Sequence, residues 1–287
     1  MITQHVLQAY RTEMYRLQPA RRIHTPEQAI DFVNERGFVY FWPVKGVVLP
    51  SLWAAVAGDR PVPNKHNDPG HVTWGWKDSL LGARCWYYAK ILRKKATFLS
   101  LEVAPWFYAL SENYGEPEAD YLQQYRDGRM TFEAKTVYET LLHAGPLDAL
   151  ELRKQARLST RESDSRFNRA LEMLQGDFKV LPVGVAHVGA WNYAFIYDLV
   201  HRFYPALPEQ ARAIRQDMAR RHLVTLYLHS VGAAPEKAIS ALFGWDKQDA
   251  AQAIAAAEQT GEIRRTAVEG EPKDWLTCAG LGENCST

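Results

Sequence analysis

The sequence predicts a mainly α protein with small β-hairpins, an α+β fold built from tandem winged helix-turn-helix modules. The segment 132–198 has the pattern of three helices followed by a two-stranded hairpin, which is the order of a winged helix. A similar succession of helices and an extended run follows it, and the N-terminal part also ends in a hairpin after helices. We therefore predict modules over 1–115, 116–205 and 206–287, the first of them irregular.

Composition is that of an ordinary soluble globular protein: 47% of the 287 residues are hydrophobic and 23% are charged. No apolar run approaches the roughly 20 residues that span a bilayer, and the N-terminus lacks a signal-peptide pattern, so we expect a cytoplasmic protein. A net charge of +1 disfavours non-specific coating of nucleic acid, although clustered charges can form a local basic face. Cys85, Cys278 and Cys285 have no metal-ligand spacing, and no glycine-rich phosphate loop is present, so we expect neither metal nor cofactor.

The N-terminal module is expected to begin with an amphipathic helix over 4–17. Thr25 is a predicted N-cap, Pro26 occupies the first turn of a second helix, and Gly37 ends that helix. The next elements are a short extended run, a short helix and a loop rich in Pro and Gly, over 38–42, 51–57 and 58–70.

A hairpin with a basic tip closes this module. Its strands are predicted over 85–92 and 96–101, and a further helix over 105–111. Positive side chains at the tip of a wing can contact DNA phosphates, whereas a solvated turn is the alternative. The predicted phosphate contacts are Arg84, Lys90, Arg93, Lys94 and Lys95.

The central module shows the helical pattern most clearly. One apolar stripe predicts a helix over 132–144; its members are Ala134, Val137, Tyr138, Leu141 and Leu142. Gly145-Pro146 breaks the chain before a second helix over 147–158. Ser159 and Glu162 have capping-box spacing, which predicts a third helix over 159–175. The buried stripe of that helix would contain Phe167, Ala170, Leu171 and Leu174. A hairpin over 178–186 and 191–197 follows.

The opposite face of this third helix is polar. It carries Arg161, Ser165, Asn168 and Arg169. Arg can bridge two acceptors of guanine, and Asn can bridge the paired groups of adenine, so this face is a candidate for the DNA major groove. Glu162, Asp164 and Glu172 on the same helix would repel phosphates, and winged helices also serve as protein-docking or scaffolding modules.

The C-terminal module is predicted to contain a long helix over 209–231, a second over 235–243, and a third that Asp246 caps and that reaches Thr260. Gly261 then precedes an extended run, as Gly176 does in the central module. The lags between matching landmarks are 261 − 176 = 85 and 232 − 145 = 87 residues, which favours a tandem repeat.

Three segments resemble the AlkZ/YcaQ-like family of bacterial DNA glycosylases. They are Glu35 to Trp42 (ERGFVYFW), Ala96 to Leu101 with Pro105-Trp106 beyond it, and 174–205, which contains WNYAFIYDL and HRFYP. The resemblance implies tandem winged helices around a concave DNA-binding face, double-stranded DNA as the partner, and a role in DNA repair.

The sequence departs from this family at its catalytic motif. The family has Gln, an apolar residue, then Gln or Asp after Gly-Phe-Val, where this sequence has Tyr40, Phe41 and Trp42. Hydrolysis of an N-glycosidic bond needs a group that orients or deprotonates water, and neither Tyr nor Trp does this well near neutral pH. No catalytic residue is therefore assigned. Tyr40 and Trp42 could instead stack on a base, plug a DNA gap or pack in a core.

We thus expect a DNA-binding protein related to DNA glycosylases, acting in repair or damage recognition, to which the resemblance transfers DNA affinity better than catalysis. One alternative is an active glycosylase for alkylated or cross-linked bases; its replacement water-activating group would come from Asp59, His66, Asp68 and His71. Others are a sequence-specific transcription regulator and a scaffold that binds another protein through an aromatic surface.

Overall fold

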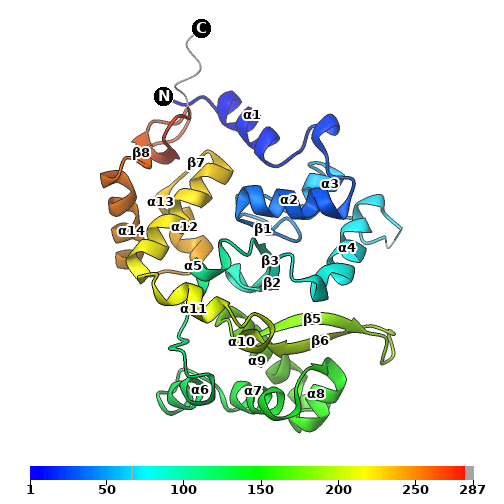
Figure 1. Ribbon diagram of the computed structural model, residues 1–287. Helices are drawn as coiled ribbons and strands as arrows, with labels where there is room; N and C mark the ends of the chain where they lie inside the picture. Colours follow the sequence, from blue (N-terminus) through cyan, green and yellow to red (C-terminus); the bar gives the residue numbers. More distant parts are fainter. Residues whose placement is uncertain (66, 282–287) are drawn as a thin grey trace.

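The computed structural model of the protein describes residues 1–65 and 67–281. It is mainly helical with small antiparallel sheets, so the predicted α+β fold class is confirmed (Figure 1). Within the described residues there are three sheets, ordered β1-β3-β2, β4-β6-β5 and β7-β9-β8. The order first, third, second therefore occurs three times along the chain, as a tandem repeat requires. The module boundaries at 115 and 205 stay a prediction.

The N-terminal part follows the predicted start and stop signals. Thr25 caps α2 by accepting a hydrogen bond from the backbone NH of Gln28, and Gly37 ends that helix. The helix α4 was not predicted. The elements are α1 (Gln4–Met14), α2 (Pro26–Arg36), β1 (Phe38–Tyr40), α3 (Leu52–Ala57), α4 (Val72–Leu80), β2 (Tyr87–Lys90), β3 (Ala96–Leu99) and α5 (Ala104–Tyr108).

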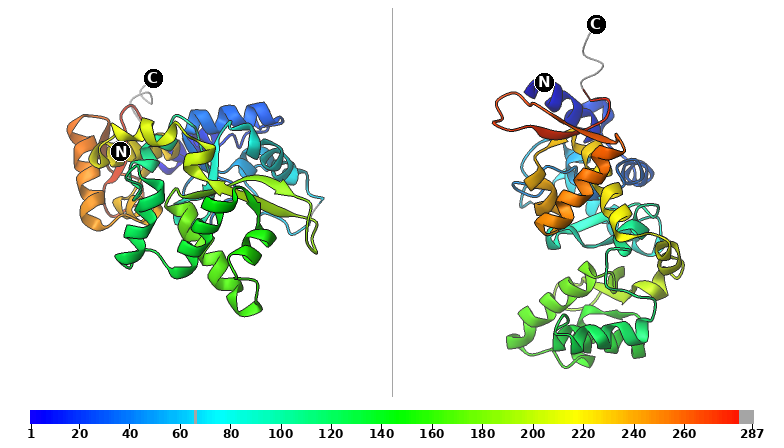
Figure 2. Two further views of the ribbon diagram at one scale, coloured as in Figure 1. Left: turned by 60° about the horizontal axis from the view of Figure 1, so that its bottom comes forward. Right: turned by 90° about the vertical axis from the view of Figure 1, so that its left-hand side faces the viewer.

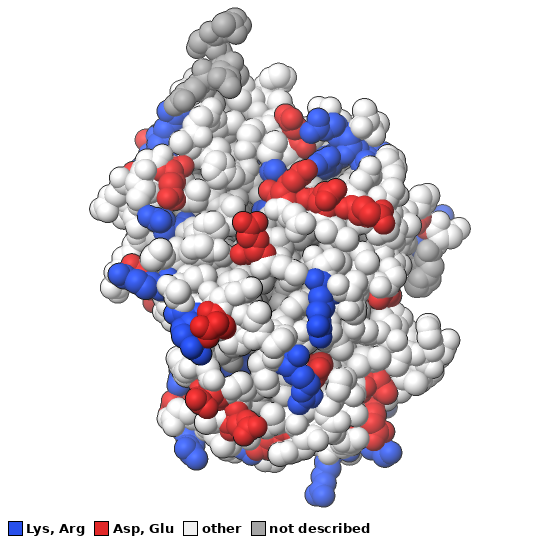
Figure 3. All heavy atoms as spheres, viewed as in Figure 1, with Lys and Arg blue, Asp and Glu red and all other residues white. Residues whose placement is uncertain are grey.

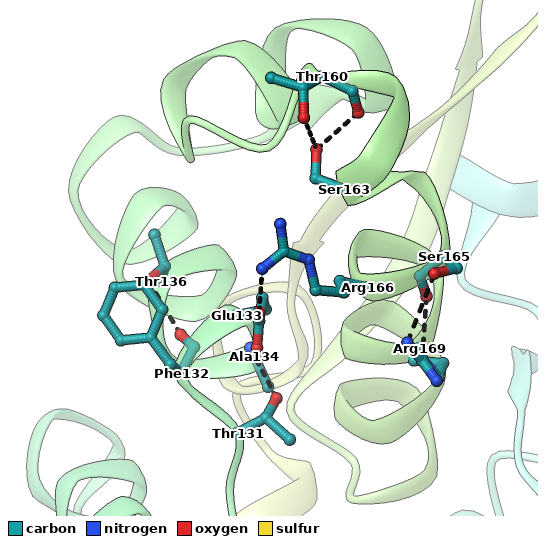
Figure 4. A network of polar contacts seen from close by, with 10 residues as sticks. All are labelled: Thr131, Phe132, Glu133, Ala134, Thr136, Thr160, Ser163, Ser165, Arg166 and Arg169. Atoms are coloured by element: carbon teal, nitrogen blue, oxygen red, sulfur yellow. Dashed lines mark hydrogen bonds and ion pairs between the residues drawn. The ribbon is translucent and has the colours of Figure 1, made fainter.

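The central part differs from expectation at two helix starts. Leu147 and Asp148 form a short strand paired with β6. The capping box predicted at Ser159 is wrong: the Ser163 hydroxyl donates to the carbonyl of Thr160, which closes a tight turn before the helix begins (Figure 4). The elements are α6 (Pro117–Arg126), α7 (Phe132–Ala144), β4 (Leu147–Asp148), α8 (Ala149–Gln155), η5 (Arg161–Ser163), α9 (Asp164–Gly176), β5 (Val180–Ala186) and β6 (Ala194–Leu199).

The long helix predicted over 209–231 is wrong, because two helices occupy this range. Arg215 is extended and forms the N-terminal cap of α12, and the resulting bend lets α11 pack against α5. The elements are α10 (Val200–Phe203), α11 (Leu207–Arg212), α12 (Gln216–Val231), β7 (Ala233–Ala234), α13 (Glu236–Phe243), α14 (Lys247–Gln259), β8 (Ile263–Thr266) and β9 (Trp275–Cys278).

One apolar core joins the N-terminal elements, α1 to α5, and the C-terminal elements, α11 to β9, into a single body. A shared core contains Leu7 of α1, Phe38 of β1 and Leu228 of α12. The elements from α7 to β6 have a core of their own, in which all four predicted residues of the α9 stripe are buried. Figure 2 shows this central unit set to one side of the other two. The structure therefore consists of a composite body and an attached central unit.

Candidate nucleic-acid interface

A cleft of 550 Å³ opens beside the end of β1. Its lining residues are Trp42, Pro43, Val44, Lys45, Arg93, Lys95 and Ala96. The cleft is built from two turns that sheet pairing brings together: Tyr40 pairs with Thr97, and the backbone NH of Phe41 donates to the carbonyl of Ala96. An aromatic wall with cations at its rim is the chemistry that stacks a base and holds its phosphate.

The basic tip is formed by Arg93, Lys94 and Lys95, between β2 and β3. Arg93 and Lys94 both have positive φ, of 52° and 57°, so the chain turns sharply and directs the side chains outward. All three are exposed, and none has an ion-pair partner among residues 1–65 and 67–281. The turn packs between α9 and α13. These charges thus lie where all three sets of elements meet.

Tyr40 and Trp42 occupy different environments. Tyr40 is 1% exposed, and its hydroxyl donates weakly to the carbonyl of Leu92 at 3.4 Å. Burial raises the pKa of Tyr40 to about 12, although the charge of Arg93 acts in the opposite direction. Trp42 is half-buried and lines the cleft. Tyr40 is therefore a core residue, and Trp42 is available to a ligand.

The structure does not bring Arg84 and Lys90 to the basic tip as free charges. Arg84 lies at the opposite end of β2, with its guanidinium 4.7 Å from the ring centre of Phe203. Lys90 forms an ion pair of 2.8 Å with Glu172 on α9. Phosphate contact by Arg84 and Lys90 stays a prediction. The basic tip consists of residues 93–95 alone.

The polar face of α9 is exposed as predicted. Arg161 lies in the turn before the helix, and Asn168 points outward from its first half. Arg169 folds back along the helix, where its guanidinium donates to the backbone carbonyl of Ser165 at 3.2 Å (Figure 4). Contact of this face with a DNA groove stays a prediction.

Two carboxylates expected to repel phosphates from α9 are neutralised. Asp164 pairs with Arg153 of α8, and Glu172 pairs with Lys90. On the face of the molecule in Figure 3, acidic and basic side chains alternate over a largely uncharged surface. Local pairing therefore leaves the helix less acidic than its sequence indicates.

The loop after α3 does not assemble the alternative water-activating group within the described residues. Asp68 is held by two hydrogen bonds from Arg60, of 2.6 and 3.0 Å, which lower the pKa of this carboxyl. His71 packs edge-on against Trp42, with ring centres 5.4 Å apart. Asp59 is exposed, and His66 lies outside the described residues. In the part of the chain described, no three His, Cys, Asp or Glu are grouped to hold a metal.

A buried cation under the aromatic surface was missed from the sequence. Lys77 of α4 is 1% exposed; it pairs with Asp78, and its Nζ lies 4.4 Å from the ring centre of Phe195. Burial lowers the pKa of Lys77, whereas Asp78 raises it. Lys77 also donates a hydrogen bond of 3.0 Å to the hydroxyl of Tyr193. The available signal was a lysine followed by Asp within the aromatic run Trp74 to Asp78.

Three-stranded sheets that repeat in the same order along a mainly helical chain are the organisation of tandem winged-helix modules. Residues 23–244 match the model of a family described as AlkZ related, and the chain belongs to that family. The structure is similar to that of a Streptomyces sahachiroi DNA glycosylase, AlkZ, with a TM-score of 0.58 and 16% sequence identity. This similarity, which is one of fold, covers 97% of this chain and 71% of the other.

A comparison with curated proteins finds no match. No helix among the described residues is long and apolar enough to cross a membrane. The family resemblance predicted from the sequence is confirmed.

Proposed function

We propose that this protein binds duplex DNA and recognises damage in it, as a member of the AlkZ-related family that does not use Tyr40 or Trp42 to activate water. The observation that carries the proposal is the basic tip, residues 93–95, at the rim of the Trp42 cleft. Three exposed cations with no ion-pair partner among the described residues gain free energy by replacing the counterions of DNA phosphates. The exposed face of α9 is the proposed second contact.

The replaced motif separates binding from catalysis in this proposal. A phenol with a pKa of about 12, buried in the core, neither reaches a sugar nor accepts a proton near neutral pH. Trp42 presents a ring and a donor, which suit stacking on a base. DNA recognition is therefore supported by Trp42, whereas water activation is supported by neither side chain.

The test is the salt dependence of duplex binding after changing Arg93, Lys94 and Lys95 together to alanine. Loss of three phosphate contacts should reduce the slope of log K against log salt by about 3 and weaken binding at low salt. The matched control changes Arg212 and Arg215, whose side chains are exposed and paired with Glu209 and Asp217. An unchanged slope in the triple variant would refute the proposal.

Base release, measured in the same samples with alkylated duplex, distinguishes the alternatives. We expect salt-sensitive binding without free base. Release of a base would establish an active glycosylase and direct mutagenesis to Asp59, Asp68 and His71. Preference for one undamaged sequence over a lesion would instead establish a transcription regulator, and absence of binding at low salt would favour a protein scaffold.

A further inference from the structure

Three aromatic rings run from the cleft to the connection between β5 and β6. They are Trp42, after β1, Trp74 on α4 and Tyr193 beside β6, which we call the aromatic track. The ring centres of Trp42 and Trp74 are 6.1 Å apart, and those of Trp74 and Tyr193 are 6.2 Å apart. Trp74 is 44% exposed. Segments distant in sequence thus form one partly open aromatic surface.

Both ends of the aromatic track carry features suited to nucleic acid. At one end, Trp42 shares its cleft with Lys45, Arg93 and Lys95. Beyond the other end, two residues before Tyr193, Trp191 is 91% exposed. An indole so fully in water contributes little to the core of its own chain, and its ring is free to stack on an unpaired base.

The rings of the aromatic track are held in place from below. The hydroxyl of Tyr193 accepts hydrogen bonds from Nζ of Lys77 at 3.0 Å and from Nε1 of Trp74 at 3.4 Å, and it donates to Asp78 at 3.0 Å. Because Lys77 is buried, its charge fixes these groups and is not offered to phosphates. A surface organised before binding loses less side-chain entropy on binding.

This chemistry distinguishes between forms of DNA. In an intact duplex the faces of the bases are covered by their neighbours, so protein rings reach only backbone and groove edges. Unpaired bases expose their faces, and stacking on protein aromatics is the main contact of proteins that bind single strands. We infer that the aromatic track binds unpaired bases, and that the preferred ligand is duplex DNA containing a short single-stranded stretch. The inference rests on the proposed DNA-binding function.

The test compares three labelled DNAs of equal length, by fluorescence anisotropy at one salt concentration: a blunt duplex, the same duplex with a gap of four unpaired nucleotides, and a single strand. The wild-type protein should prefer the gapped duplex. Trp74→Ala and Trp191→Ala should each weaken gapped-duplex binding about 10-fold, as expected for one lost base stack, and leave blunt-duplex binding unchanged.

Phe132→Ala is the matched control, because Phe132 is an aromatic residue of α7 that is 62% exposed and lies outside the aromatic track. The Trp191 variant removes an almost fully exposed side chain, so its result does not depend on the stability of the fold. Equal affinity of the wild type for gapped and blunt duplex, or an unchanged preference in both Trp variants, would overturn the inference alone. If the protein bound none of the three DNAs, the proposed function would be overturned as well.

Discussion

The Nζ atom of Lys77 on α4 donates a hydrogen bond of 3.0 Å to the hydroxyl of Tyr193, in the connection between β5 and β6. The contact joins the composite body to the central unit. Asp78 accepts from the same hydroxyl, also at 3.0 Å, so a cation, a phenol and a carboxylate form one network at this junction. The position of the β5–β6 hairpin therefore depends on a buried charge.

Lys77→Met should lower the free energy of unfolding by about 2–4 kcal/mol. The substitution preserves volume but leaves Asp78 and the Tyr193 hydroxyl without their cation, and breaking a buried pair is costly. Urea denaturation followed by tryptophan fluorescence measures the loss. Lys135→Met is the control: its pair with Glu139 is a surface pair along one helix, worth about 0.5 kcal/mol. Similar losses in the two variants would contradict a structural role for the network.

Lys179 should make stability depend on pH in a predictable direction. Burial lowers the pKa of Lys179 to about 8 from 10.5, although Asp177, Asp120 and Glu112 oppose the shift. Between pH 8 and 10 the unfolded chain therefore holds more protons than the folded one. Stability contributed by this group is present above the unfolded pKa and is lost as pH falls through about 8.

The measurement is the difference in unfolding free energy between wild type and Lys179→Met from pH 6 to 10. We expect the wild type to gain on the variant between pH 8 and 10, by at most about 1.4 kcal/mol per pH unit, and no change in the difference below pH 7. Tyrosines of the unfolded chain ionise at about pH 10, but both proteins contain the same tyrosines, so the difference between the two curves cancels their contribution. Parallel curves over the whole range would show that Lys179 keeps its ordinary pKa.

Local signals explain which elements could be predicted from the sequence. The start of α2 at Thr25 and the start of α14 at Asp246 each depend on one side chain that accepts from the backbone NH three residues later. Such contacts are set by neighbours in the chain, so a short sequence window contains them. The buried stripe of α9 is equally local, because helical spacing alone selects its four apolar residues.

The remaining features depend on distant partners. The helix α4 carries exposed Trp74 and buried Lys77, which reverses the usual pattern, because the rings that surround Lys77 come from the residue after β1, from β2 and from β6. The bend at Arg215 follows from the packing of α11 on α5. Only one side of the Trp42 cleft was predicted. The run of positive charges at residues 93–95 identified the basic tip, whereas the proximity of that tip to Trp42 depends on the register of β1 and β3.

Gly232→Ala should destabilise the composite body by about 2–3 kcal/mol. Gly232 has a φ of 78°, and an added Cβ would lie 2.8 Å from Tyr10 and 3.0 Å from Leu7, both on α1. Gly244→Ala separates the two causes, since Gly244 has a φ of 72° with no described atom within 4 Å of the added Cβ. The control should lose only about 1 kcal/mol. Thermal denaturation would refute the predicted contact with α1 if both variants lost the same amount.

Asn168→Ala should weaken duplex binding without affecting the fold. Asn168 is exposed on α9, and no hydrogen bond to another described residue accounts for its amide, so its removal leaves the core intact. A lost base-edge contact would cost about 1–3 kcal/mol at one sequence position and relax preference there. Phe167→Ala, one residue away in the core, should instead cost about 3–5 kcal/mol of stability. Competition binding against a panel of duplex sequences checks the Asn168 prediction. An equal loss of affinity for every sequence would show that Asn168 contacts phosphates and not base edges.

Tyr40→Phe should leave DNA binding and any base release unchanged, because the hydroxyl is buried and, within the part of the chain described, bonds to the carbonyl of Leu92 alone, at 3.4 Å. The removed hydrogen bond is long, so the cost in stability should be about 1 kcal/mol or less. Trp42→Ala is the contrasting change: it opens the wall of the cleft and should weaken binding to the gapped duplex about 10-fold. Anisotropy and base-release assays on both variants decide the roles of the two side chains. If Tyr40→Phe abolished base release that the wild type performs, the hydroxyl would be part of the chemistry, and the separation of core and cleft roles would be wrong.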